Sequence, residues 1–389
     1  MTERFHFYLP TRVYFGAKVI EIAGQESRRY GRRALMVSGG MAKKSGALPK
    51  VLKSFESAGI KTVVFDEVET YPGVETIENG ARVARDEKCK MVVGIGGECP
   101  MDAAKAMAVL TESPSPLKLY FGKEKVKRPP VPIIAVPLTA GSGSEVTPFS
   151  AITTKNAFLR VESIISSLIY PHAAFVDPEF TKPFPSAVTI NNGIDALSHA
   201  IEGYLSLQSQ PFTDCLALEA VRLIREFLPK VLDEPENSSY RSQMSYAALL
   251  SGMVIAHTGI GLTHQMGYHL ALNLGLAHGE ANGVLLPWVS ELLLNQGQGK
   301  LDRLANCLGV AIEELPESKK VRSVIKNIHE FISRTGLSPE LERKGLTEEK
   351  IQDFSERTFK NKAALRGSSE RITLEAIRKT YDQALRLSR

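Results

Sequence analysis

Four side chains between residues 195 and 278 are of types that bind metal ions. Asp195 and His199 stand four residues apart in a segment with helical periodicity, so both side chains leave one face of one helix. His264 begins a second apolar run, and His278 follows the break at Gly275. One carboxylate with several imidazoles suits a divalent first-row ion such as iron, zinc, nickel or cobalt. The spacing therefore predicts a metal site assembled from three places in the chain.

A simpler interpretation of the same residues stays open at this point. An Asp/His pair at helical spacing is also typical of a surface pair, or of a histidine that is satisfied within a core. The argument for metal binding is the concentration of candidates, because the chain has only 8 histidines. Four of them lie in one short stretch, at His257, His264, His269 and His278. The pattern favours a metal site without deciding it.

Length and composition indicate a globular chain with two domains. The chain has 389 residues, of which 43% are hydrophobic and 23% charged, and this is enough to build two cores. The net charge of +5 is spread along the chain. The basic cluster at residues 123–128 is short and lacks interleaved aromatic residues. We therefore expect no nucleic-acid partner.

Cysteine usage and the apolar pattern predict a cytoplasmic protein. The four cysteines (Cys89, Cys99, Cys215 and Cys307) are far apart and form no CxxC motif, which is typical of reduced thiols. The N-terminal residues alternate in character rather than forming the apolar core of a signal peptide. No run reaches the roughly 18 apolar residues that a membrane helix needs. We expect no membrane partner.

The first half of the chain alternates short apolar strands with helices. Strands are predicted at 34–38, 62–66, 91–97 and 132–137, helices at 18–32, 47–58, 74–87 and 102–111, and a strand or hairpin at 5–15. This alternation is typical of a parallel, doubly wound sheet, which binds ligands beyond the carboxyl ends of its strands. Prolines punctuate the stretch before residue 186, and helical patterns dominate after it. We predict an α/β domain over residues 1–183 and an all-helical domain over residues 184–389.

Two glycine-rich stretches of the first domain could hold phosphates. GIGGECPMDAAKAMAV (94–109) predicts a strand, a glycine turn and a helix, whose backbone N–H groups can bind a pyrophosphate. A plain tight turn is the alternative. LTAGSGSEVTPFSAITT (138–154) has small residues, and the hydroxyls of Thr139 and Ser142 can donate hydrogen bonds. A Gly/Ser-rich surface loop is the alternative there.

The longer motifs around the candidate ligands resemble a known family. DALSHAIEGYLS is similar to one signature of the iron-containing (group III) alcohol dehydrogenases. GIGLTHQMGY, which ends at Tyr268 and is followed after nine intervening residues by HGEANGVLLP, is similar to a second signature of that family. The resemblance implies that Asp195, His199, His264 and His278 hold one catalytic divalent metal, with Fe²⁺ favoured and Zn²⁺ as the alternative. It also implies a Rossmann-like dinucleotide-binding domain followed by an all-α metal-binding domain, the fold that this family shares with dehydroquinate synthase.

The resemblance extends to the nucleotide motifs, with departures. The family pattern GGGSPxDxAK is matched in part, but Glu98 replaces a glycine and Cys99 replaces a serine. A glutamate beside a pyrophosphate is electrostatically unfavourable unless its side chain turns away. Tyr71 also stands where the family often has asparagine. The cofactor-binding residues that the resemblance implies are Gly39, Gly40, Lys43, Gly96, Gly97, Glu98, Cys99, Asp102, Leu138, Thr139 and Ser142.

The segment SGGMAKKSG (38–46) bears on which nicotinamide cofactor is used. NAD-preferring relatives usually carry an aspartate after this strand, for the adenosine ribose, and Gly39 stands in its place here. Lys43 and Lys44 offer positive charge to a 2′-phosphate. The segment is similar to that of NADP-preferring aldehyde reductases and butanol dehydrogenases. We favour NADP(H) over NAD(H), with a solvent-facing lysine pair as the alternative.

The resemblance implies a metal-dependent alcohol dehydrogenase or aldehyde reductase that transfers hydride between NAD(P)(H) and a small alcohol or aldehyde. Tyr268 stands where many relatives carry a further histidine, and we expect it to line the substrate pocket. His257 and His269 are candidates for proton relay or for purely structural roles. A homodimer is the default oligomeric state.

Two alternatives remain beside this interpretation. Glu98 and Tyr71 could mark a protein that binds metal but not nicotinamide and serves as a binding or regulatory module. An enzyme similar to dehydroquinate synthase or glycerol dehydrogenase would have the same fold. The Asp-x3-His and His-x13-His spacings argue against that second alternative.

Overall fold

A computed structural model describes residues 4–155, 159–296, 299–337, 340–361, 365, 367–368 and 371–387. The chain divides into two compact units. The α/β unit consists of Tyr8–Pro185 with Glu236–Ser245. The helical unit consists of Met1–Phe7, Ser186–Pro235 and Tyr246–Arg389.

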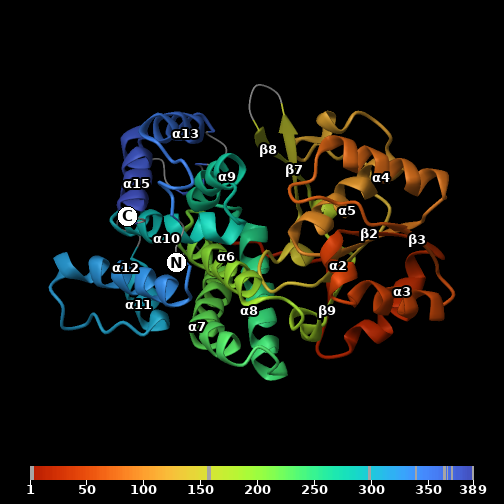
Figure 1. Cartoon of the computed structure of the whole chain (residues 1–389), viewed down its shortest axis with the longest axis horizontal. Coiled ribbons are helices and arrows are strands. Elements are labelled where there is room, and N and C mark those ends of the chain that lie inside the picture. The colour runs from red at the N-terminus through yellow and green to blue at the C-terminus, as the bar shows by residue number, and fades with distance from the viewer. Residues whose placement is uncertain are drawn as a thin grey trace. The chain divides into compact units, whose positions relative to one another are not determined.

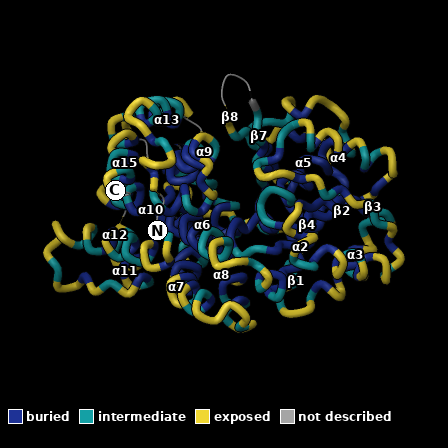
Figure 2. Tube along the Cα trace, viewed as in Figure 1, coloured by how far each residue is buried: buried dark blue, intermediate teal, exposed yellow. Residues whose placement is uncertain are grey.

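The α/β unit is built on a parallel sheet of six strands in the order β1-β9-β6-β4-β2-β3. Figure 1 labels β2, β3 and β9 of this sheet. Its strands are β1 (Arg12–Phe15), β2 (Arg33–Ser38), β3 (Lys61–Phe65), β4 (Met91–Gly96), β6 (Ile133–Pro137) and β9 (Ala173–Val176). The central strands are apolar along their whole length because helices cover both faces of the sheet. Every residue of β4 is buried, as Figure 2 shows.

Alternate residues of each strand serve two separate cores. Leu35 and Val37 of β2 pack with helices α4 (Val74–Asp86) and α5 (Glu98–Glu112). Ala34 and Met36, which point to the opposite face, pack with α1 (Ala23–Ser27) and α3 (Ala47–Ser57). The predicted parallel, doubly wound sheet is therefore confirmed. The remaining short elements of this unit are α2 (Gly40–Lys44), η1 (Val19–Ile22), η2 (Arg28–Tyr30), η3 (Leu117–Tyr120), η4 (Ser144–Val146), η5 (Ser167–Ile169) and η6 (Pro178–Thr181).

A second, small sheet was not predicted. Strands β7 (Phe149–Lys155) and β8 (Leu159–Ile165) pair antiparallel, and β5 (Gly122–Lys123) joins β8 in parallel. Its strands escaped prediction because residues 138–154 were interpreted as one nucleotide loop. Of the strand or hairpin predicted at 5–15, the strand is confirmed as β1, which pairs in parallel with β9. The helix predicted to begin at Asp102 begins at Glu98, because the glycine turn leads directly into it.

Helix α10 is the central helix of the helical unit. It contacts α6, α9, α12 and α15 (Figure 1). The helices are α6 (Ser186–Leu205), α7 (Pro211–Asp233), α8 (Ser238–Thr258), α9 (Leu262–Leu274), α10 (His278–Leu294), α11 (Leu301–Leu308), α12 (Glu317–Arg334), α13 (Glu348–Lys360) and α15 (Leu374–Leu387). The first part of α8, up to Ser245, belongs to the α/β unit. No strand follows β9 in the described residues, so the all-helical second half is confirmed.

Among the described residues, no single helix has the length and apolar composition needed to cross a membrane. Helices α8 and α9 meet that test only as a pair, and they are bent by 108° at the break between them.

Candidate metal centre and nucleotide loops

Three helices bring the four predicted metal ligands to one place within the helical unit. Asp195 and His199 lie on α6, His264 on α9, and His278 is the first residue of α10. Asp195, His199 and His264 each offer a ligand atom, and these atoms lie within 4.8 Å of one another. His278 Nε2 lies 3.6 Å from Asp195 Oδ1, the same oxygen that lies 3.3 Å from His264 Nε2. Asp195 is thus the point on which the imidazoles converge.

Close packing between α6 and α10 places His278. Gly275 ends α9 in a left-handed conformation, and the chain then turns into α10. A methyl group on Gly279 would lie 1.8 Å from the carbonyl oxygen of Asn191 in α6, so only glycine permits this approach. The rings of His199 and His264 stack at 4.3 Å between centroids, with planes 8° apart.

The site is buried, and burial controls its protonation. Burial opposes the charge of Asp195, but the three imidazoles outweigh it and hold its pKa well below the usual range. Burial lowers the pKa of His199 to about 4 and also lowers the pKa of His278. Burial acts in the same direction on His264, but Glu202 and Asp195 outweigh it and raise its pKa to about 10. An anionic carboxylate beside neutral imidazoles is the state that binds metals, and a cation can replace a proton on His264.

The donor set fits a divalent first-row ion. Nδ1 of His199 and Nδ1 of His278 are buried and have no hydrogen-bond partner within the described part of the chain. Buried polar atoms of this kind call for a partner. Three imidazoles and one carboxylate match the ligands that iron and zinc accept in proteins.

The predicted pyrophosphate residues come together in the α/β unit. Gly96 ends β4 with φ at 156°, a conformation that favours glycine, and Gly97 precedes the first turn of α5. The Leu138 N–H donates to Gly96 O at 2.9 Å. A methyl group on Gly97 would lie 3.3 Å from Thr139 Oγ1. The glycine turn and the loop that begins at Leu138 are therefore neighbours.

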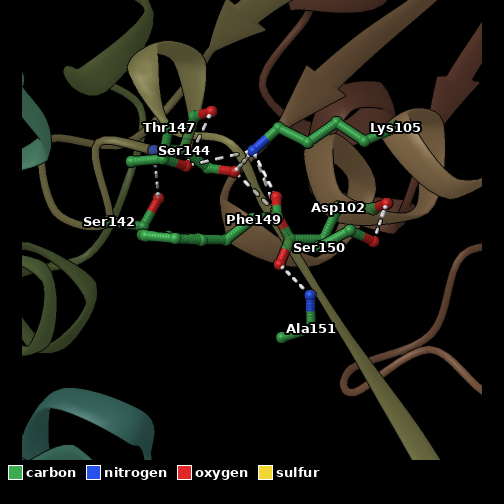
Figure 3. A network of polar contacts seen from close by, with 8 residues as sticks. All are labelled: Asp102, Lys105, Ser142, Ser144, Thr147, Phe149, Ser150 and Ala151. Carbon is green, nitrogen blue, oxygen red and sulfur yellow. Dashed lines mark hydrogen bonds and ion pairs between the residues drawn. The ribbon is translucent and has the colours of Figure 1, made fainter. Parts of the chain in front are cut away.

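Two of these predicted residues have side chains that face inward. Leu138 is fully buried in the core beneath the sheet, so only its backbone is available to a ligand. The Asp102 carboxylate accepts hydrogen bonds from Ser144 Oγ and the Ala151 N–H, both at 2.7 Å (Figure 3). Ser142 Oγ accepts from the Ser144 N–H at 3.3 Å. Asp102 therefore fixes the conformation of the loop through these hydrogen bonds and does not face a ligand.

The departures from the family pattern meet at one point. Tyr71 has a positive φ of 57°, which is unusual for a residue with a side chain, and its N–H donates to Cys99 Sγ at 3.4 Å. Burial, and then the charge of Glu98, raises the pKa of the Cys99 thiol to about 12. Cys99 is thus a neutral thiol that holds Tyr71. Glu98 lies in the first turn of α5, where the helix dipole favours a negative charge.

At the end of β2 the structure adds a carboxylate beside the predicted phosphate-binding lysine. Gly39 and Gly40 lead into the short helix α2, which carries Lys43. Lys43 forms an ion pair with Asp66. Asp66 directly follows β3, which pairs in register with β2. A cation, Lys43, and a carboxylate, Asp66, therefore lie together beyond the carboxyl ends of the neighbouring strands β2 and β3.

Comparison with known proteins covers both units. Residues 10–178 match the family model "Iron-containing alcohol dehydrogenase", and residues 189–385 match "Fe-containing alcohol dehydrogenase family, C-terminal". The chain belongs to the iron-containing alcohol dehydrogenase family. A solved structure of 1,3-propanediol oxidoreductase is 30% identical with a TM-score of 0.93, and the match covers 98% of this chain and 100% of the other. The fold expected from the resemblance is therefore confirmed.

Two relatives in the iron-containing alcohol dehydrogenase family differ in the cofactor that their names state. The NADPH-dependent butanol dehydrogenase of Clostridium saccharobutylicum is 31% identical, over 92% of this chain and 89% of its own length. The NAD-dependent methanol dehydrogenase of Bacillus methanolicus is 29% identical, over 92% of this chain and 93% of its own length. Both are similar along nearly their whole length.

Tyr268, His257 and His269, the candidates for the substrate pocket and for proton relay, lie in different surroundings. The ring of Tyr268 lies beside His278, with centroids 5.3 Å apart. His257 stacks on Phe7 at 4.1 Å, and its Nδ1 lies 2.8 Å from Met253 O. These contacts favour a structural role for His257.

His269 likewise has a packing role, because it stacks on Phe354 at 5.3 Å. Burial, and then the nearby Arg357, lowers the pKa of His269 to about 4. A neutral ring in this setting is typical of a core histidine. Tyr268 is thus the candidate that lies next to the predicted metal ligands.

Two polar residues beside the predicted ligands were not identified from the sequence. Glu202 contacts His264 Nδ1, and the Asn282 side-chain amide donates to Asp195 Oδ1 at 3.0 Å. Glu202 follows His199 by three residues on α6, so its helical spacing was a usable signal. Asn282 lies on α10 and meets Asp195 only through packing of the helices.

Proposed function

We propose that this member of the iron-containing family is a metal-dependent alcohol dehydrogenase that also acts as an aldehyde reductase. It transfers hydride between NAD(P)(H) and a small alcohol or aldehyde. The observation that carries the proposal is the convergence of three imidazoles on the buried Asp195. In this proposal residues 1–183 bind the nucleotide, and residues 184–389 bind the metal and the substrate.

The proposed ligands are Asp195, His199, His264 and His278, with Fe²⁺ favoured over Zn²⁺. When bound, the ion supplies Lewis acidity toward the substrate oxygen, and the nicotinamide supplies or accepts the hydride. The protein's part is to hold the ligands before the reaction begins. Asn282 fixes the Asp195 carboxylate by donating to Oδ1 at 3.0 Å. Burial of the ligands keeps bulk water from competing for the ion.

Tyr268 is the proposed wall of the substrate pocket. Its ring lies beside His278, whose side chain, at 15% exposed, is the most accessible of the four ligands. A substrate oxygen must approach the metal from an accessible side. An aromatic ring there gives apolar contact to a short carbon chain, and such contact distinguishes chain lengths only weakly.

The proposed pyrophosphate site is the turn at Gly96 and Gly97. Backbone N–H groups of the first turn of α5, which is 15 residues long, offer positive partial charge to a phosphate. The hydroxyl of Thr139 lies close to this turn, and Ser142 belongs to the same loop. Glu98 and Cys99 lie in that first helical turn. The proposed cofactor-binding residues also include Gly40 and Asp102, and Asp102 acts by holding the loop that carries Ser142.

The cofactor preference that we propose is NADP(H) over NAD(H). Gly39 offers no carboxylate to a ribose, and Lys43 offers a cation to a 2′-phosphate. A side chain at residue 39 would begin 2.7 Å from Val68 O, so the local backbone excludes a carboxylate there. Asp66 pairs with Lys43 and offsets part of its charge. We infer that the Lys43–Asp66 pair sets how strong the preference is.

Activity of the full-length chain tests this function directly. The purified protein would be stripped of metal with a chelator, reloaded with Fe²⁺ under anaerobic conditions or with Zn²⁺, and assayed with short aldehydes and alcohols. We expect turnover only after reloading, and faster turnover with NADPH than with NADH. His278→Ala should abolish metal-dependent turnover. His329→Ala is the control, because it removes a histidine on another helix, α12, and it should keep that turnover.

A result without turnover would separate the alternatives. Protein that binds metal but neither nucleotide would contradict the dehydrogenase and favour the binding or regulatory module. Tighter binding of NADH than of NADPH would contradict only the cofactor preference. A homodimer and a cytoplasmic location stay predictions from the sequence.

A further inference from the structure

We propose that Glu202 is a positioning residue that fixes the tautomer of His264, so that His264 Nε2 is available to a metal. The inference rests on the metal-dependent function proposed above and concerns a residue outside the ligand set. Glu202 lies on α6 and its carboxylate reaches α9, where His264 stands. Glu202 therefore links two of the three helices that build the site.

Both oxygens of the Glu202 carboxylate are occupied by contacts with α9. Oε1 accepts the backbone N–H of Thr263 at 2.5 Å, and Oε2 contacts His264 Nδ1. The side chains of Glu202 and His264 are only 3% and 1% exposed, so water does not compete with these bonds. A carboxylate is the side chain that can accept at both oxygens at once.

The contact decides which nitrogen of His264 carries a proton. A carboxylate oxygen can only accept, so His264 Nδ1 must donate. In a neutral ring the other nitrogen, Nε2, is then unprotonated and has a lone pair. That nitrogen lies 3.3 Å from Asp195 Oδ1, on the side of the candidate metal centre. A carboxylate that orients a metal-binding histidine in this way is a general device of metal sites.

Replacement of Glu202 by glutamine exposes this role because an amide has one acceptor and one donor. The Thr263 backbone N–H is always a donor, so it takes the amide oxygen. The amide NH₂ then faces His264 Nδ1, which must accept, and the proton moves to Nε2. This tautomer cannot bind a metal through Nε2. The opposite amide orientation would place two donors against each other at Thr263.

The experiment compares metal affinity in full-length wild-type protein, Glu202→Gln and a matched control. Thr263→Ala removes a buried hydroxyl next to the same bonds but keeps the backbone N–H that Glu202 accepts. Affinities for Zn²⁺ and Co²⁺ would be measured by chelator competition, with the Co²⁺ absorption spectrum as a second readout. We expect Glu202→Gln to bind about 10- to 100-fold more weakly and to change the Co²⁺ spectrum. Thr263→Ala should keep both the affinity and the spectrum.

A measurement on the wild-type protein guards against a variant that fails to fold. Nitrogen NMR of the histidine rings in Zn²⁺-loaded wild-type protein should show a ring with protonated Nδ1 and metal-bound Nε2. An unprotonated Nδ1 on every metal-bound ring would overturn the inference.

The two proposals fail in different ways. Wild-type affinity and spectrum in a folded Glu202→Gln would overturn the role of Glu202 and leave the enzyme intact. Wild-type protein that binds no divalent ion would contradict the proposed function itself, and the inference with it.

Discussion

Replacing Lys105 by methionine should destabilise the α/β unit strongly. Lys105 on α5 is fully buried, and its Nζ donates to Ser144 Oγ at 2.8 Å, Thr147 Oγ1 at 3.1 Å and Phe149 O at 2.7 Å (Figure 3). Its ammonium also lies 3.5 Å from Asp102 Oδ1. Burial lowers the pKa of Lys105, while the carboxylate of Asp102 opposes that effect. The pair ties α5 to the loop that carries the proposed nucleotide contacts.

The magnitude follows from the buried pair. Methionine keeps the apolar stem but leaves the Asp102 carboxylate buried without its counterion, and such a loss costs about 3–5 kcal/mol. The α/β unit falls in a size class where 1 kcal/mol corresponds to about 2–4 °C in Tm. Lys105→Met should therefore lower the unfolding temperature of this unit by roughly 10 °C. The double variant with Asp102→Asn should lose less than Lys105→Met alone, because no charge is left unpaired.

Thermal unfolding followed by circular dichroism measures this effect, with and without NADPH. Lys118→Met, at an exposed position in η3, is the matched control and should leave Tm nearly unchanged. Lys105→Met should also weaken NADPH binding, because the loop at Ser144 loses its anchor. A Tm for Lys105→Met equal to that of Lys118→Met would refute the reasoning, since the pair would then contribute no stability.

Three further predictions concern other parts of the structure. Asp66→Asn should raise the ratio of kcat/KM for NADPH to kcat/KM for NADH by about two- to fivefold, because Lys43 then faces the 2′-phosphate without a paired carboxylate. This factor corresponds to the typical free energy of an exposed ion pair. An unchanged ratio would contradict the role of the pair. Burial raises the pKa of Glu145 from 4.5 to about 7, so the folded state binds this proton more tightly and loses stability as pH rises between those values. Glu145→Gln should therefore be more stable than wild type above pH 7, by up to about 3 kcal/mol, and no more stable at pH 4, which urea unfolding at both pH values would measure. Gly279→Ala should lower both Tm and Zn²⁺ affinity, because its methyl group would overlap the Asn191 carbonyl oxygen. Overpacking of this kind costs about 1–3 kcal/mol or more. Unchanged Zn²⁺ affinity would show that the approach of α10 to α6 does not determine the geometry of the metal site.

The sequence predicted the elements whose pattern is local. Strand β4 and helix α4 were predicted within about two residues, because an unbroken apolar run and a 3.6-residue period are sufficient signals. Strand β8 was missed because its partner β7 had been assigned to a loop, and because Ile164 is the only buried residue of β8. The place of Glu236–Ser245 in the α/β unit depends on contacts distant in sequence, which no local pattern carries.

The candidate site divides in the same way. The spacing of Asp195 and His199 on one helix pointed to a shared face, whereas the approach of α9 and α10 depends on packing. The helical periodicity was sufficient to place Glu202 on the same face as His199, but Glu202 was treated only as part of the family motif. The contact between Asp66 and Lys43 joins residues beyond two adjacent strands, and it qualifies a cofactor preference inferred from Gly39, Lys43 and Lys44.

Transfer of deuterium from the cofactor tests the central claim most directly. Metal-reloaded protein would reduce a short aldehyde with NADPH or NADH deuterated at carbon C4 of the nicotinamide, and the alcohol would be analysed by mass spectrometry. The account predicts deuterium on the carbinol carbon in the metal-loaded protein and none with His264→Ala, which removes a proposed ligand. Metal-loaded wild-type protein that forms no deuterated alcohol from either nucleotide would contradict the assignment as a metal-dependent alcohol dehydrogenase.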